Sequence, residues 1–238
     1  YYFSGIRLNE EYGIIPMHTF NFTTAPQQAQ LLMAGTGDNY FTNPGQTTPI
    51  SLVYTAPDWS ASNPFGTPDI AVVRFGTPLT GPDVTIAPAG SVQEGDVLTM
   101  VGFGWPAVAG QGYYPQRDGN VRGWEMPVRD GVPGNVNPEF YVGTSFSNTT
   151  GLALNANVSA EDSGGIVLKN GMAVGMMASG TGGTGSIGSM EYLDLSDPNT
   201  ASRFATYVPE PTGIVAAGAA MGVLLLRRNR RDTTQQAG

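Results

Sequence analysis

The chain has 238 residues with no cysteine and one histidine, which excludes disulfides, zinc fingers, a cysteine nucleophile and a histidine-rich metal site. Its 33 glycines and 18 prolines exclude a helical bundle and favour many short strands joined by turns. Without residues 207–238, the chain has 7 basic and 17 acidic side chains. The resulting net charge of -10 argues against nucleic-acid binding, because such a surface repels phosphates.

Short strands are predicted along most of the chain. The sequence begins with tyrosine and shows no signal peptide, so we expect a mature form or a fragment that lacks N-terminal strand(s). Apolar or alternating runs bounded by Gly, Pro, Asn and Asp predict the strands. In chain order these are residues 2–8, 12–17, 28–34, 49–54, 69–75, 96–103, 139–146, 151–154, 164–168, 172–178 and 189–194. Such a series favours an all-β barrel or sandwich.

Two segments are expected to differ from this pattern. Residues 104–138 are rich in Gly, Pro and charge, and we interpret them as a connection between two halves with exposed loops. Asp197 is a suitable helix cap and Pro198 suits the first helical position, so a helix is predicted over residues 199–207.

The C-terminus combines a proline-rich motif, an apolar run and a basic cluster. These are Pro209-Glu210-Pro211, residues 213–226, and Arg227, Arg228, Arg230 and Arg231. The run is shorter than the about 20 residues of a full membrane span, and a buried terminal helix is one interpretation. A basic cluster beside an apolar run is, however, a membrane-topology signal.

The order of these three features resembles the PEP-CTERM sorting signal of Gram-negative bacteria over residues 208–231. The resemblance implies an exported protein that is attached to the inner membrane through its apolar segment. An exosortase-type enzyme would then process it, and the product would remain in the periplasm, on the outer surface or in the extracellular matrix. Residues 207–238 are thus expected to be a sorting signal, and the residues that carry the function are expected to precede residue 207.

Three residues upstream are candidates for chemistry. Ser163 precedes Gly164 and Gly165, which let the backbone turn tightly and leave the hydroxyl uncovered. A serine hydroxyl needs a base to become a nucleophile, and His18 is the only histidine available. Asp69 begins a strongly apolar strand and could orient an imidazole. The alternatives are an ordinary turn at Ser163, a packed or surface histidine, and a turn residue at Asp69.

The order and spacing of these residues carry more weight than each residue alone. His18 precedes Asp69 by 51 residues, and Asp69 precedes Ser163 by 94. This is the chain order of the chymotrypsin arrangement and differs from that of subtilisin and the α/β-hydrolases. The spacing places His18 and Asp69 in one half and Ser163 in the other, as a cleft between two barrels requires.

The sequence here resembles the trypsin-like (chymotrypsin-fold) serine proteases from about residue 4 to residue 206. Six segments carry the resemblance in the family's order: residues 4–9 followed by His18, 59–75, 101–104, 160–165, 171–180, and 191–195 with the helix at Asp197. It implies two six-stranded Greek-key β-barrels, over residues 1–95 and 96–206, and a short C-terminal helix.

The resemblance also implies a role for individual residues. Ser163 would be the nucleophile, His18 the general base and acid, and Asp69 the residue that holds the imidazole. The backbone N–H groups of Glu161 and Ser163 would form the oxyanion hole, and the Asp162 carboxylate would support that loop. The residues expected to shape the substrate pocket are Asn157, Ala178, Ser179 and Gly180.

With Asn157 at the pocket base, a preference for small or apolar residues is expected. The implied substrate is a protein or peptide, and no cofactor or metal is expected. Two other functions stay open. Glu161 replaces the family's usual glycine, which is compatible with an inactive protease-fold protein that binds peptides or extracellular matrix. A β-sandwich adhesin would share the composition, and it predicts that His18, Asp69 and Ser163 lie far apart.

Overall fold

The computed structural model describes residues 3–22, 33–104, 107–108, 112–113, 118–129, 131, 137–147, 162–181 and 187–208. Contacts divide the chain into two compact units, Tyr1–Tyr207 and Val208–Gly238. The predicted sorting signal from Pro209 to Arg231 lies outside the described residues. Within the described ranges, no helix is long and apolar enough to cross a membrane.

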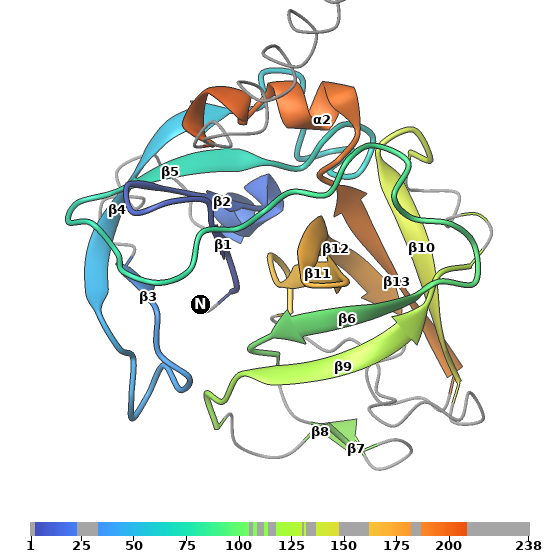
Figure 1. The fold of residues 1–238 in the computed structure, drawn as a ribbon, viewed down its shortest axis with the longest axis horizontal. Coiled ribbons are helices and arrows are strands. Elements are labelled where there is room, and N and C mark those ends of the chain that lie inside the picture. The colour runs from blue at the N-terminus through green and yellow to red at the C-terminus, as the bar shows by residue number, and fades with distance from the viewer. Residues whose placement is uncertain are drawn as a thin grey trace, which may run out of the picture. The chain divides into compact units, whose positions relative to one another are not determined.

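The first half of the chain forms an antiparallel sheet in the order β1-β2-β5-β4-β3. Its strands are β1 (Ile6–Arg7), β2 (Tyr12–Ile15), β3 (Met33–Gly35), β4 (Thr47–Thr55) and β5 (Ala71–Phe75). The apolar side chains on the inner face form one core, which contains Ile15, Ile50, Ala71, Val73, Phe75 and Leu79. This sheet curls around that core (Figure 1).

The second half forms an antiparallel sheet in the order β10-β13-β12-β11-β6-β9. Its strands are β6 (Val97–Gly102), β9 (Arg122–Pro127), β10 (Tyr141–Ser147), β11 (Ile166–Lys169), β12 (Met172–Thr181) and β13 (Ile187–Asp194). Its buried core is rich in methionine and aromatic residues, including Met100, Trp124, Met126, Met190 and Tyr192. The predicted all-β fold of two antiparallel halves is therefore confirmed, with five strands in the first sheet, rather than six, among the described residues.

The prediction that residues 104–138 form only a connection and loops is wrong. The structure places strand β9 there, as well as β7 (Ala107–Val108) and β8 (Gly112–Tyr113). In β9, Trp124 and Met126 are buried on one face, while Gly123 and Glu125 lie on the other. This alternation is typical of a half-buried strand, but the glycine at 123 and the proline at 127 made the short segment resemble a loop.

The C-terminal helix of the first unit begins where it was predicted but ends at Ser202, before the predicted end at residue 207. The Asp197 carboxylate accepts hydrogen bonds from the N–H groups of Asn199 and Thr200, and α2 spans Pro198–Ser202. A short 3-10 helix, η2 (Ala205–Tyr207), follows. Another 3-10 helix, η1 (Met17–Phe22), was not predicted. The predicted strand at 151–154 and residues 28–32 of the strand at 28–34 lie outside the described residues.

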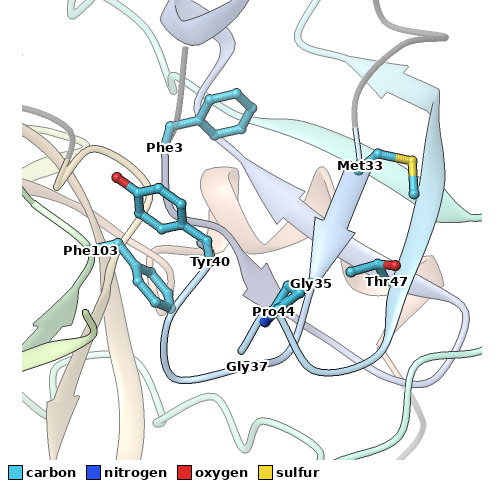
Figure 2. Close-up of a pocket in the computed structure, with 8 residues that line it drawn as sticks. All are labelled: Phe3, Met33, Gly35, Gly37, Tyr40, Pro44, Thr47 and Phe103. Atoms are coloured by element: carbon cyan, nitrogen blue, oxygen red, sulfur yellow. The ribbon is translucent and has the colours of Figure 1, made fainter. Parts of the chain in front are cut away.

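An apolar cavity of about 370 Å³ lies against the first sheet, and residues of both end strands, β1 and β3, line it. A second pocket of about 220 Å³ shares Phe3, Met33, Gly35 and Phe103 with it. Figure 2 shows the rings of Phe3, Tyr40 and Phe103 on one side of this second pocket and Met33 and Thr47 on the other.

Candidate active site

His18 lies in η1, directly after strand β2. Pro16 ends the strand, and its carbonyl accepts hydrogen bonds from the backbone N–H and the hydroxyl of Thr19. This turn brings the imidazole back toward the start of β5. Only 15% of the His18 side chain is exposed, so the ring is largely shielded from solvent.

Asp69 meets His18 because their strands are neighbours. Ile15 at the end of β2 pairs with Ala71 at the start of β5. This pairing brings His18 and Asp69 together although they are 51 residues apart in sequence. The Asp69 carboxylate is fully buried, and both of its oxygens face His18. One accepts the His18 backbone N–H at 2.8 Å, and the other lies 2.5 Å from the imidazole Nδ1. These hydrogen bonds offset the cost of burying the carboxylate.

Ser163 lies in a tight turn before strand β11, and its Oγ is 3.0 Å from Nε2 of His18. Gly164 has a φ of +86°, and its N–H donates to the carbonyl of Met177. A Cβ on Gly164 would lie 2.0 Å from the Ser4 carbonyl oxygen, so only glycine fits. Ser4 also donates its N–H to the carbonyl of Ser163 at 2.9 Å, which ties the turn to the first half of the molecule.

The three side chains form a continuous chain from the carboxylate through the imidazole to the hydroxyl. A carboxylate at Nδ1 favours the tautomer that carries its proton there, which leaves Nε2 free to accept the serine proton. The arrangement can therefore generate a serine nucleophile. It also overturns the expectation of the β-sandwich hypothesis that these residues lie far apart.

Asp162, beside Ser163, is buried and holds a neighbouring loop. Its carboxylate accepts the N–H of Gly104, which follows strand β6, at 2.7 Å. A Cβ on Gly104 would lie 2.2 Å from the same carboxylate, so the glycine permits this approach. The Gly102-Phe103-Gly104 segment and the serine turn therefore pack directly against each other.

The predicted pocket residues fall partly outside the described ranges. Ala178, Ser179 and Gly180 lie on strand β12, with Ala178 buried and Gly180 exposed. Asn157 and the oxyanion-loop residue Glu161 lie outside the described residues.

Ser179 pairs in register with the buried Glu191, and that pairing places an acidic residue beside the predicted pocket wall. The Glu191 carboxylate accepts a hydrogen bond from Arg129 at 2.9 Å. Burial raises the pKa of Glu191, although Arg129 acts in the opposite direction.

Tyr141 and Phe65 are site neighbours that sequence reasoning missed. The Tyr141 hydroxyl accepts the N–H of Asp69 at 3.1 Å and donates to the carbonyl of Thr67 at 3.0 Å. Phe65 lies edge-on between the rings of His18 and Tyr141. A tyrosine that begins a strand and a phenylalanine in a loop have no distinguishing sequence pattern, so only the fold reveals this contact.

In the described part of the chain, no group of three or more histidine, aspartate or glutamate side chains could hold a metal ion. Proton transfer between Ser163 and His18, with Asp69 as the compensating charge, is the reaction step that this geometry allows.

No protein-family model and no curated protein matches the chain. Among solved structures, it is similar to the scabies mite inactivated protease paralogue S-I1, with a TM-score of 0.62 and 14% sequence identity. The similarity covers 86% of this chain and 85% of the mite protein. The protein therefore has a chymotrypsin-like protease fold, whereas that mite relative is named as an inactivated protease.

Proposed function

We propose that the protein is a serine endopeptidase that hydrolyses peptide bonds through an acyl-enzyme intermediate. The observation that carries the proposal is the hydrogen-bonded chain of Asp69, His18 and Ser163, with the imidazole within reach of both partners. The burial of Asp69 and the tight packing of the serine turn keep this chain of contacts in place.

In the proposed mechanism, Ser163 Oγ attacks the carbonyl carbon of the substrate while Nε2 of His18 accepts its proton. The tetrahedral intermediate collapses as the imidazolium returns that proton to the leaving amine, which breaks the C–N bond. A water molecule then attacks the ester, again with His18 as base, and releases the acid product and free Ser163. Asp69 stabilises the imidazolium in both stages.

The proposal also includes an oxyanion hole and a substrate pocket. The backbone N–H groups of Ser163 and Glu161 would bind the oxyanion, and such a donor contributes about 3–4 kcal/mol to transition-state stabilisation. Asp162 would support the loop that presents them. Asn157 and the strand segment from Ala178 to Gly180 would shape a pocket for small or apolar side chains.

Labelling with a fluorophosphonate probe tests the proposal. The full-length chain should react, and Ser163→Ala and His18→Ala should each abolish labelling because nucleophile and base are both required. Ser202→Ala is the matched control, because Ser202 is an exposed serine at the end of α2 and is not among the site residues. A folded full-length chain that does not react would favour the peptide- or matrix-binding pseudoenzyme, with Glu161→Gly as the next variant.

We further propose that the protein is exported and attached to the inner membrane through residues 213–226 until an exosortase-type enzyme processes it. The Pro209-Glu210-Pro211 motif, apolar run and arginines support this proposal. Replacing the three motif residues with alanine in a host that has an exosortase should leave the unprocessed form in the membrane fraction. Identical size and distribution of variant and parent would contradict it.

A further inference from the structure

We propose that Tyr141 is a positioning residue for Asp69, a role that rests on the proposed protease function. Tyr141 is the first residue of strand β10 in the second sheet, whereas Asp69 precedes β5 in the first. Its hydroxyl bridges two backbone groups on either side of Pro68, namely the N–H of Asp69 and the carbonyl of Thr67. The second half of the molecule thus holds the backbone that presents the carboxylate.

Backbone support matters here because of how the Asp69 carboxylate is used. Both carboxylate oxygens hydrogen-bond to His18, one through the backbone N–H and one through the imidazole. Within the described residues, no other side chain orients this carboxylate. The orientation of the carboxylate therefore depends on the Thr67–Asp69 backbone, which Tyr141 holds.

The burial and ring contacts of Tyr141 hold its side chain in a position where it can support the Asp69 backbone. The residue is buried, with 2% of its surface exposed, and its ring packs edge-on against Phe65. Phe65 in turn packs against the His18 ring, so Tyr141 reaches the imidazole both through Asp69 and through Phe65. Burial and the neighbouring Asp69 charge raise the pKa of the phenol, which keeps the hydroxyl protonated as a donor to Thr67.

Tyr141→Phe isolates the hydroxyl, because the ring and its contact with Phe65 are retained. Loss of both hydrogen bonds frees the Asp69 backbone, and a displacement of even about 1 Å can reduce the rate about 100-fold. We expect the maximal fluorophosphonate labelling rate to fall about 10–100-fold on this basis. The probe concentration at half-maximal rate should change less than about twofold, because Tyr141 does not contact the probe.

Tyr192→Phe is the matched control. Tyr192 is equally buried, in the second sheet, but its hydroxyl has no hydrogen-bond partner in the described structure. Its removal should leave the labelling rate unchanged. A general effect of deleting a buried tyrosine hydroxyl would instead slow labelling in both variants.

An Asp69→Asn background separates positioning from general structural damage. If Tyr141 acts through Asp69, Tyr141→Phe should reduce labelling less than about twofold further in that background. An equal reduction in both backgrounds would overturn the proposal.

The single histidine of the chain gives a readout that does not need activity. The ring N–H proton of His18 that faces Asp69 should give one far-downfield NMR resonance, which Tyr141→Phe shifts or broadens and Tyr192→Phe leaves unchanged. If the parent chain does not label but the resonance responds in this way, the protease function fails, while the support of the Asp69–His18 pair by Tyr141 stands. If the parent labels but neither labelling nor the resonance responds to Tyr141→Phe, the positioning role fails alone.

Discussion

The two halves of the molecule contribute to the site in different ways. The first sheet supplies the proton-handling pair, His18 and Asp69, through the direct pairing of β2 with β5. The second supplies Ser163 on a turn whose shape depends on a positive φ at Gly164 and on a contact from Ser4. His18 and Asp69 are therefore held by strand register, whereas Ser163 is held by turn geometry.

Both halves have buried apolar cores, and the first also borders a cavity. Met33 and Phe41 are exposed in the first half, and a cavity of about 370 Å³ lies against its sheet. The second sheet surrounds a core in which Met100, Met126 and Tyr192 are fully buried. The buried carboxylate lies in the half that borders this cavity. Local hydrogen bonds and the contact with Tyr141 fix the Asp69–His18 pair.

The largest expected effect is on the first half. Asp69→Asn should reduce peptide hydrolysis about 10⁴-fold, because an amide N–H opposite Nδ1 favours the wrong imidazole tautomer. The fold should be retained, since the asparagine carbonyl can still accept the His18 backbone N–H. Initial rates of peptide cleavage are the measurement, with Asp83→Asn, an exposed partner of Arg7, as control. Activity within tenfold of the parent would show that Asp69 does not orient the base.

The second prediction concerns the turn of the second half. Gly164→Ala combines a positive φ with a clash against the Ser4 carbonyl, so unfolding should become easier by about 2–5 kcal/mol. Gly171→Ala is a matched control, because Gly171 has a φ of +78° and open space around its Cβ position. Gly171→Ala should lower the free energy of unfolding only by the cost of placing an alanine at a positive φ, about 1–2 kcal/mol. Equal urea midpoints for the two variants would contradict the packing argument.

The smallest effect is expected at an ion pair between the loop after β4 and the end of α2. Arg203 donates hydrogen bonds of 2.7 and 2.8 Å to Asp58 and thereby holds the pKa of Asp58 below its ordinary value of 3.8. Because Asp58 is 45% exposed, Asp58→Asn should lower the free energy of unfolding by less than about 1 kcal/mol at pH 7.

The pH dependence of that difference follows from the direction of the shift. A lowered pKa means that the folded state binds fewer protons, so the contribution of the pair is present above about pH 4 and is lost as pH falls further. Thermal unfolding of parent and Asp58→Asn should therefore converge toward pH 3. If the difference in stability between parent and Asp58→Asn grows as the pH falls, the ion pair with Arg203 is not its cause.

Much of the site could be predicted because its three central residues stand in recognisable local sequence patterns. A serine before two glycines, a single histidine and an acid before an apolar strand identify Ser163, His18 and Asp69 as a set. The structure brings these three together. The contribution of Tyr141 could not be predicted, because it depends on a contact between the two sheets. Tyr141 and Asp69 are 72 residues apart in sequence. Strand β9 was missed because glycine and proline conceal the alternation of Trp124 and Met126 with polar neighbours.

The order of the site residues along the chain also sets an order in time. During synthesis, His18 and Asp69 leave the ribosome first, and Ser163 follows 94 residues after Asp69. At about 5–20 residues per second, roughly 5–20 seconds separate the two events. For that interval the growing chain contains the acid–base pair but no nucleophile. The proposed protease therefore cannot cleave neighbouring nascent proteins, or itself, until its second half has been made.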